Sequence, residues 1–360
     1  MFSIHHHLIE SPVFSSTLIA WYQAHKRDLP WRHTQNPYYI WLSEVILQQT
    51  RVAQGLPYYL KFVENYPTVI ALAEAPSEDV LRLWQGLGYY SRARNLHETA
   101  KIITKDYQGI FPDNYQDLLK LKGIGPYTAA AVASLAFDQQ VAVVDGNVYR
   151  VLSRIFGIET DIASSQAPKE FAKLANELIS STQPAEFNQA IMEFGALQCV
   201  PVSPQCMFCV FNENCVANNT GKVSKLPVKS KKLKVKERFF NYIVLEQNQQ
   251  IWMKKRPLKD IWAEMYDFML LESDEPQSLD QLAENPLIRQ VLAMGILKNQ
   301  SQPVVHILTH QKIYTVFWHI TINQSVKVLG LPNMQSYSLD QIDDLPKSTL
   351  VNNYLKEHFF

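Results

Sequence analysis

The chain has 360 residues, of which 47% are hydrophobic and 19% are charged, so it is long enough for about two domains and apolar enough to fill their cores. No apolar run is long enough to span a bilayer, and residues 1–10 lack the pattern of a secretory signal, so we expect a soluble cytoplasmic protein. Lys plus Arg equals Asp plus Glu at 34 each, so net charge neither favours nor excludes a nucleic-acid partner. The His5–His7 triplet is expected to be a frayed terminus rather than a metal site.

The first informative element is a helix predicted to begin at Pro37. Asn36 is a typical N-cap, and proline is favoured in the first helical turn. Glu44 lies in this helix and is the only acidic residue between Asp28 and Glu64. Either Glu44 lies on the polar edge of the helix, or it is a buried carboxyl. Burial would raise its pKa, so that it could act as a general acid near neutral pH.

Residues 115–121 and 128–135 have helical patterns and predict two helices joined by a tight turn. Gly123 and Gly125 let the backbone turn sharply and approach another surface, and Pro126 suits the first turn of the second helix. The peptide N–H groups at the start of that helix form an anion site. Gly123, Gly125 and Thr128 are therefore the candidate contacts to a DNA backbone, and a plain connection between two helices is the alternative.

Asp145 follows a short apolar run, residues 141–144, and precedes a helical pattern. An Asp in this place commonly caps the helix, and a capping carboxylate stays ionised and rigidly held. A carboxyl that holds a proton and a carboxylate that stays ionised are the pair of groups that glycoside hydrolysis uses. Glu44 and Asp145 are the predicted pair.

All four cysteines of the chain lie within seventeen residues, with the spacing C-x6-C-x2-C-x5-C. Four thiolates suit tetrahedral zinc or an iron–sulfur cluster. Zinc usually takes two C-x2-C pairs and only one is present, so the spacing favours a cluster. We expect a structural role for it; a redox role has no support from these residues. The predicted ligands are Cys199, Cys206, Cys209 and Cys215.

The remainder of the chain predicts a second, α+β domain. Residues 239–256 predict two strands around a QNQQ turn, 310–322 predict another strand, and 279–297 look more helical. The lysine-rich residues before them predict a linker, either a solvated tether or a contact to DNA phosphates. The predicted division is a helical domain at 1–221, a basic linker at 222–236 and an α+β domain at 237–360.

Five motifs occur in the order and with the separations of one family: WLSEVILQQTRV, GIGPYT, VVDGNV, FNQAIMEFGALQC and the cysteine spacing. On these motifs the sequence resembles the MutY-type adenine DNA glycosylases of the helix–hairpin–helix superfamily, strongly over residues 15–222 and weakly beyond. The resemblance implies a mostly helical glycosylase fold with a [4Fe-4S] cluster loop, followed by a Nudix-like domain. It implies a monomeric enzyme, associated with the nucleoid of a bacterial cytoplasm, that acts on double-stranded DNA and removes adenine paired with 8-oxoguanine or guanine.

The resemblance also implies roles for residues at the bond that breaks. Glu44 would protonate adenine at N7 and help activate water, and Asp145 would stabilise the oxocarbenium-like sugar. Tyr127 and Asn147 would position these groups. Bifunctional relatives carry a lysine in place of Tyr127, so its phenol implies an enzyme that uses water and stops at the abasic site. Tyr149, which stands where some relatives have a lysine that traps the sugar, points the same way.

Further roles concern the two bases of the mispair. Trp31, Arg32 and Gln189 would line the adenine pocket after the base is flipped out of the helix. Gln49 and Tyr89 would fill or wedge the space at the mispair.

The predicted second domain lacks the Nudix hydrolase signature, so it would read the 8-oxoguanine rather than hydrolyse nucleotides. Leu308, Thr309 and His310 occupy the place of the Phe-Ser-His tip of relatives, and an ordinary hairpin tip is the alternative. The loop VPVSPQ between the first two cysteines has no Lys or Arg, although relatives use this loop to contact DNA.

Two other functions would fit the same motifs less well. A thymine- or pyrimidine-directed glycosylase would differ in its base pocket, and Gln189 and the second domain argue against it. A non-catalytic DNA-binding or electron-transfer protein would have no need of Glu44 and Asp145.

Overall fold

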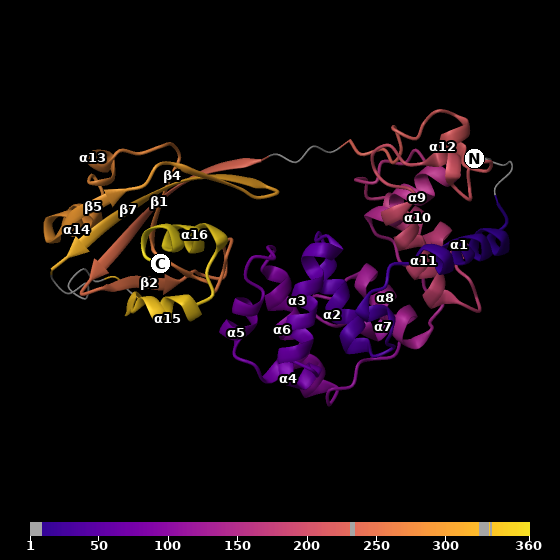
Figure 1. Ribbon diagram of the computed structural model, residues 1–360, viewed down its shortest axis with the longest axis horizontal. Helices are drawn as coiled ribbons and strands as arrows, with labels where there is room; N and C mark the ends of the chain where they lie inside the picture. Colours follow the sequence, from indigo (N-terminus) through magenta and orange to yellow (C-terminus); the bar gives the residue numbers. More distant parts are fainter. Residues whose placement is uncertain (1–8, 231–234, 324–330, 332) are drawn as a thin grey trace. The chain divides into compact units, whose positions relative to one another are not determined.

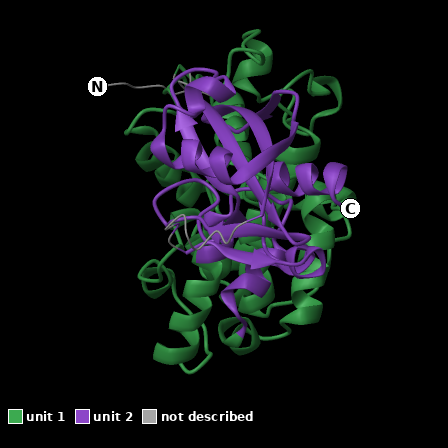
Figure 2. Cartoon of the chain, turned by 90° about the vertical axis from the view of Figure 1, so that its left-hand side faces the viewer, with its two compact units in different colours: residues 1–74, 95–231 green, residues 75–94, 232–360 purple. Residues whose placement is uncertain are grey.

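The computed structural model describes residues 9–230, 235–323, 331 and 333–360, and the chain divides into two compact units (Figure 1, Figure 2). The first unit comprises Met1–Glu74 and Asn95–Lys231, and the second comprises Ala75–Arg94 and Lys232–Phe360. The His5–His7 triplet and residues 231–234 of the predicted linker lie outside the described residues. Within the described ranges, no helix is both long and apolar enough to cross a bilayer.

The first unit is built from helices over its described residues. They are α1 (Ser11–His25), η1 (Pro30–Arg32), α2 (Pro37–Leu47), α3 (Val52–Asn65), α4 (Val69–Glu74), the larger part of α6 (Ser91–Asp106), α7 (Tyr115–Leu118), α8 (Pro126–Phe137), α9 (Gly146–Phe156), α10 (Ala167–Leu178), α11 (Pro184–Leu197), η2 (Cys206–Phe208) and α12 (Val216–Asn219).

Local sequence determines where α2 begins, as predicted. The Asn36 side chain accepts a hydrogen bond of 2.9 Å from the Tyr38 N–H, and Pro37 occupies the first turn. The helix then packs against α8, whose alanines 129–131 are buried and small enough for a close approach. α11 packs against both α8 and α9, so α2, α8, α9 and α11 form one helical core.

The helix–hairpin–helix has a shorter first helix than the sequence predicts. α7 ends at Leu118, because the Leu121 N–H bonds back only three residues, to the Leu118 carbonyl, and the chain turns. Gly123 then adopts a positive φ of 82°, and Gly125 stands directly before α8. The second helix begins at Pro126, as predicted.

The second unit is a mixed sheet covered by helices. Its strands are β1 (Lys236–Gln247), β2 (Gln250–Lys255), β3 (Tyr266–Asp267), β4 (Met269–Ser273), β5 (Gly295–Gln300), β6 (Val304–Ile307), β7 (Gln311–Ile322) and β8 (Gln335–Tyr337). Its helices are α5 (Ser77–Leu83), α13 (Leu279–Leu282), α14 (Pro286–Met294), α15 (Leu339–Asp344) and α16 (Thr349–His358). The strand order is β3-β2-β1-β7-β5, with β1 and β7 parallel and β1 and β2 joined as the predicted hairpin.

Alternate residues of β7 face opposite sides of this sheet. Trp318 and Ile320 pack into the cluster that includes Ile288 of α14, whereas the Phe317 ring stacks on Tyr354 of α16 at 4.0 Å between centroids. The central strands are therefore buried on both faces, as their apolar sequences require. The fold class is confirmed: a helical N-terminal part and an α+β C-terminal part.

The expectation of helix over residues 279–297 is only partly right. α14 ends at Met294, and Gly295 begins strand β5, paired with Ile322 of β7. A Cβ at Gly295 would lie 2.7 Å from the side chains of Ile320 and Ile322, so only glycine allows this close pairing. The helical pattern cannot show that contact, because β7 is remote in sequence.

Part of the predicted linker is attached to the first unit. The Leu226 carbonyl accepts a hydrogen bond of 3.0 Å from Arg154 Nε, and the Val228 carbonyl accepts one of 3.0 Å from the Ile162 N–H. These contacts hold residues 222–230 against the helices rather than leaving them as a solvated tether. The boundaries of the three predicted segments stay a prediction.

Candidate functional site

Glu44 is buried on α2 with almost no exposed surface, at 7%. Its Oε2 accepts a hydrogen bond of 2.5 Å from the Tyr127 hydroxyl. Burial raises the pKa of Glu44 to about 7; the hydrogen bond from Tyr127 opposes this shift and the negative charge of Asp145 adds to it. Near neutral pH this carboxyl can therefore hold a proton and give it up, as a general acid does. The alternative, that Glu44 lies on the polar edge of its helix, is wrong, because the side chain is buried.

Tyr127 lies in the first turn of α8 and connects that helix to Glu44 and to α11. Its hydroxyl also lies 3.2 Å from the Met192 sulfur, so the phenol has a carboxyl and a thioether within reach. Burial and the nearby charges of Glu44 and Asp145 raise the pKa of Tyr127 well above its ordinary value. The phenol is therefore a neutral hydrogen-bond donor, and it offers no amine to attack a sugar.

Asp145 caps α9, and the cap also prepares it for chemistry. Its Oδ1 accepts from the Val148 N–H at 2.8 Å, and its Oδ2 accepts from the Asn147 amide at 2.9 Å. Burial raises the pKa of Asp145, whereas these hydrogen bonds act against that shift. Both oxygens are thus fixed in place, and the negative charge reaches Glu44, whose pKa it raises. Capping and a catalytic role are compatible at this residue.

Arg150, which the sequence reasoning missed, joins Asp145 to the cysteine segment. Its Nη2 donates to the Asn147 Oδ1 at 2.8 Å and to the Gly195 carbonyl at 2.6 Å, and its Nε donates to the Cys199 carbonyl at 2.8 Å. The guanidinium therefore holds the side chain that holds Asp145.

Two of the three residues predicted to line the adenine pocket, Arg32 of η1 and Gln189 of α11, are in contact. Arg32 Nε lies 3.3 Å from Gln189 Oε1, and Trp31 is buried with its ring edge-to-face against Tyr59. Arg32 also contributes to the field at Glu44, because its positive charge lowers the pKa of that carboxyl. Of the predicted pocket residues, Arg32 thus lies within electrostatic range of the predicted acid.

A second buried acid, Glu193, lies one turn beyond Gln189 on α11 and was not predicted. It is 1% exposed and binds both Arg27 and Arg32 through short ion pairs. A signal for it exists in the sequence, since Glu193 is an acid within the apolar run AIMEFGAL, the same signal that identified Glu44.

The hairpin at 119–125 has the geometry of an anion site. A Cβ at Gly123 would lie 2.9 Å from Asn95 Cβ, so glycine is needed there for packing as well as for its positive φ. A Cβ at Gly125 would meet nothing within 4 Å, which leaves the helix N-terminus open to a ligand. The Thr128 side chain is buried and its hydroxyl accepts a hydrogen bond of 3.3 Å from Gln48, so a contact from this residue to a phosphate would use its backbone N–H and stays a prediction.

The residues predicted to act at the mispair divide between the units. Gln49 is exposed in the first unit with a φ of 56°, whereas Tyr89, Thr309 and His310 belong to the second. Within the second unit, the Tyr89 and Thr309 hydroxyls are hydrogen-bonded, and Tyr89 has a φ of 49°. Leu308, Thr309 and His310 form the tip of the hairpin between β6 and β7. This geometry fits both a tip that contacts the base opposite adenine and an ordinary hairpin tip.

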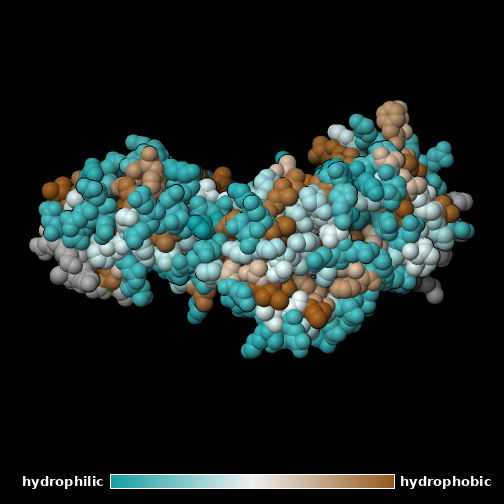
Figure 3. All heavy atoms as spheres, turned by 60° about the horizontal axis from the view of Figure 1, so that its bottom comes forward, coloured by the Kyte–Doolittle hydropathy of each residue, from teal (hydrophilic) through white to brown (hydrophobic). Residues whose placement is uncertain are grey.

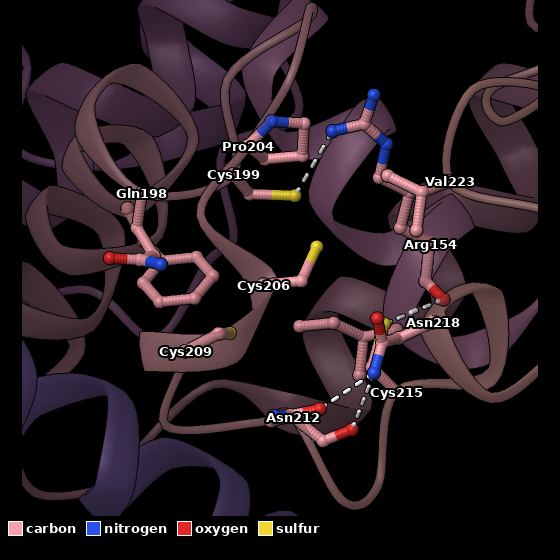
Figure 4. A pocket seen from close by; sticks show the side chains of 12 residues that line it. Arg154, Gln198, Cys199, Pro204, Cys206, Cys209, Asn212, Cys215, Asn218 and Val223 are labelled. Carbon is pink, nitrogen blue, oxygen red and sulfur yellow. Dashed lines mark hydrogen bonds between the residues drawn. The ribbon is translucent and has the colours of Figure 1, made fainter.

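The four cysteines line one pocket, into which their sulfurs point (Figure 4). The Phe211 N–H lies 3.4 Å from the Cys209 sulfur, and Arg154 Nη1 lies 3.5 Å from the Cys199 sulfur. A thiolate set bound to a metal group has use for such donors and for a nearby positive charge. Across the described part of the chain, no three His, Cys, Asp or Glu side chains are grouped closely enough to hold a metal ion.

The cysteine segment exposes several large apolar side chains. Val202 and Met207 are each 80% exposed and Phe208 is 75% exposed, on a molecule whose visible face in Figure 3 is largely hydrophilic with small apolar patches. Val202 lies in the loop between the first two cysteines and Met207 and Phe208 lie just after it, and none of the three provides a charge for a phosphate.

Comparisons with known proteins match the helical part and the α+β part of the chain to two different protein families. Residues 42–178 match the HhH-GPD superfamily of base excision DNA repair proteins, and residues 241–357 match the NUDIX domain. The chain is 35% identical over 264 residues to an adenine DNA glycosylase of Buchnera aphidicola subsp. Acyrthosiphon pisum, covering 73% of this chain and 75% of that protein. It is 42% identical over 217 residues to the adenine DNA glycosylase of Homo sapiens, covering 58% of this chain and 40% of that protein.

Solved structures resemble the helical part. A thermostable thymine-DNA glycosylase is 32% identical with a TM-score of 0.55, covering 59% of this chain and 97% of that one. Endonuclease III in a trapped covalent DNA intermediate, at 23% identity and a TM-score of 0.52, covers 59% of this chain and 99% of that one and shows the shared fold alone.

Proposed function

Because this chain belongs to the adenine DNA glycosylase family, we propose that it removes adenine from DNA by hydrolysing the N-glycosidic bond. The observation that carries this proposal is Glu44: a buried carboxyl with a pKa of about 7, held by Tyr127 and within the field of Asp145. One group is poised to give a proton and the other is fixed with its oxygens in place, as the reaction requires.

In the proposed reaction, protonated Glu44 gives its proton to N7 of a flipped-out adenine, which makes the base a neutral leaving group. As the C1′–N9 bond breaks, its electrons remain on adenine and the sugar becomes cationic. The carboxylate of Asp145 stabilises that cation. Water then adds to C1′, and ionised Glu44 takes the proton that the water releases. The products are adenine and an abasic site, and both carboxyls return to their starting state.

The same geometry supports a reaction that stops at the abasic site. A covalent sugar intermediate that leads to strand cleavage needs an amine, and the position beside Glu44 is occupied by the Tyr127 phenol. We propose that the enzyme leaves the strand intact.

The proposal extends to DNA and to the opposite base. Gly123 and Gly125 at the start of α8 are suited to a phosphate, and Tyr89 with the Thr309–His310 tip is our candidate for contact with 8-oxoguanine or guanine opposite the adenine. A monomer that works on nucleoid DNA in the cytoplasm is part of the same proposal.

We also propose a [4Fe-4S] cluster at Cys199, Cys206, Cys209 and Cys215, supported by four sulfurs around one pocket with donors from Arg154 and the Phe211 backbone. When bound, the cluster would supply a covalent link that ties residues 199–215 together. Iron content and visible absorbance of the purified chain, compared with Cys206→Ala, test this part. Bound zinc in place of iron would contradict it.

The whole proposal is tested with duplexes that carry adenine opposite 8-oxoguanine, guanine or thymine, and thymine opposite guanine. We expect abasic sites, revealed by alkali, with adenine opposite 8-oxoguanine or guanine, and an intact strand without alkali. Release of thymine instead of adenine would contradict the substrate, and strand breakage without alkali would contradict the role of Tyr127.

A further inference from the structure

Glu193 forms an ion-pair cluster beside the predicted adenine pocket. Its Oε1 accepts from the backbone N–H of Arg27 and from Arg27 Nε, both at 2.9 Å. Arg32 completes the cluster with Nη1 at 3.0 Å from Oε1 and Nη2 at 2.8 Å from Oε2. Arg32 is therefore held by a two-point fork, and its Nη1 also donates to the Arg27 carbonyl at 2.8 Å. Its guanidinium has one orientation.

That orientation determines which end of the Gln189 amide faces away from Arg32. A guanidinium nitrogen can only donate, so the amide atom that lies 3.3 Å from Arg32 Nε is the oxygen. The oxygen of Gln189 is thus occupied, and the –NH2 group remains for a ligand. A free glutamine could rotate its amide and offer either a donor or an acceptor; this one offers donors.

The cluster lies beside the proposed reaction centre. Gln189, Met192 and Glu193 share successive turns of α11, and the Met192 sulfur contacts the Tyr127 hydroxyl that binds Glu44. The charge of Arg32 also reaches Glu44. A base that presents N7 to Glu44 would have its Watson–Crick edge available to another group of the pocket.

We propose that Glu193 is a positioning residue for base specificity, which acts through Arg32 to hold the Gln189 amide with its –NH2 group toward the base. This inference rests on the proposed function. Adenine has an acceptor at N1 that such a donor can bind, whereas guanine and hypoxanthine carry N1–H, which meets the –NH2 group donor to donor. A buried donor left unpaired is costly, so the fixed amide selects against these bases.

The plain alternative is that Glu193 only stabilises the fold by joining α11 to the segment after α1. A measurement of specificity separates the two roles, because a stabilising contact affects all substrates equally. The probe is a pair of duplexes that differ at one atom: adenine, or 1-deazaadenine, in which C–H replaces N1, each opposite 8-oxoguanine. Single-turnover rates of base release with the full-length protein give the ratio of adenine to 1-deazaadenine.

We expect the wild-type ratio to be roughly 10- to 100-fold, the effect of one lost hydrogen bond at a buried donor. In Glu193→Gln the fork that orients Arg32 is lost, the amide can rotate, and the ratio should fall to within about threefold of one. Glu193→Asp keeps the charge and should restore most of the ratio. Arg27→Met removes the other ion pair of Glu193 but leaves Arg32 in place, so it should reduce stability without changing the ratio.

If Glu193→Gln does not fold, Arg32→Lys provides the second test, because lysine keeps the positive charge but has no Nε–H for the Gln189 oxygen. It should also lower the ratio. A ratio that stays at the wild-type value in either variant, with both rates reduced equally, would overturn the inference and leave the proposed function intact. Failure of the wild-type protein to release adenine at all would instead overturn the proposed function.

Discussion

Two buried glutamates in the first unit have opposite protonation behaviour. Glu44 on α2 is 7% exposed and Glu193 on α11 is 1% exposed, so burial alone would raise the pKa of both. The pKa of Glu44 is about 7, whereas that of Glu193 is about 2. Burial disfavours the charge of Glu193 as well, but hydrogen bonds from Arg27 and Arg32 outweigh it.

The difference lies in the partners. Glu44 has one neutral phenol as its hydrogen-bond donor, and the guanidinium of Arg32 affects it through its charge. Glu193 has two guanidiniums in direct contact. A carboxyl that must exchange a proton is kept apart from cations, and a carboxyl that must hold an arginine is surrounded by them. The surroundings of Glu44 suit proton transfer, and those of Glu193 suit holding Arg32 in a fixed orientation.

The largest effect should come from removing the proton of Glu44. Glu44→Gln keeps the shape and the hydrogen bond with Tyr127 but cannot give a proton, so the single-turnover rate of adenine release should fall roughly 100- to 10,000-fold. Binding of the duplex, measured by anisotropy, should stay within a few-fold of wild type. A rate close to that of wild type would show that Glu44 is not the acid.

Glu193→Gln should reduce stability, in contrast to Glu44→Gln. It leaves two guanidiniums near an uncharged amide, which costs about 3 kcal/mol, at the low end for a buried pair because Arg27 is 36% exposed. Urea unfolding, followed by a probe in the helical unit, measures the loss. A change below about 0.5 kcal/mol would mean that the cluster contributes nothing to folding.

The two glutamates should also give opposite dependence of stability on pH. The folded-state pKa of Glu44 lies above the ordinary glutamate value of 4.5, so the unfolded chain loses its proton first as the pH rises. Glu44 should therefore destabilise the wild type relative to Glu44→Gln increasingly from pH 4.5 to about pH 7, by about 3 kcal/mol at most. For Glu193 the folded pKa is depressed, so its stabilisation is complete above pH 4.5 and is lost toward pH 2.

Tyr127→Phe should produce the smallest change and the most specific one. The phenol lowers the pKa of Glu44 by its hydrogen bond, so its removal should raise that pKa and move the alkaline fall of activity to higher pH. The pH profile of the single-turnover rate measures this shift. A shift toward lower pH, or none, would contradict the proposed contact.

Local features of the fold and site are predictable from the sequence, whereas contacts between remote segments are not. Asn36 and Asp145 cap their helices as expected, because a cap depends on neighbours two or three residues away. Gly295 was expected in a helix but begins strand β5. Its pairing with Ile322 of β7 is a contact between distant segments that the local sequence does not show. The hydrogen bond from Gln48 to the Thr128 hydroxyl joins residues 80 positions apart, and the local sequence does not show it.

In the candidate site too, local features could be predicted from the sequence and contacts between remote segments could not. Glu44 could be found because an isolated acid in an apolar helix needs an explanation. Glu193 carries the same signal, but its function depends on Arg27 and Arg32, which are more than 150 residues away in the chain. Arg150 was missed for a similar reason, since its acceptors at Gly195 and Cys199 are distant in sequence.

The titration of the Glu44 carboxyl itself is the most direct test. Infrared difference spectra of wild type minus Glu44→Gln, recorded across a pH series, isolate the stretch of this one protonated carboxyl. The contrast between the two glutamates predicts that the band of the protonated form disappears around pH 7. Its disappearance around pH 4 to 5, where a solvated glutamate of pKa ~4.3 titrates, would contradict the account.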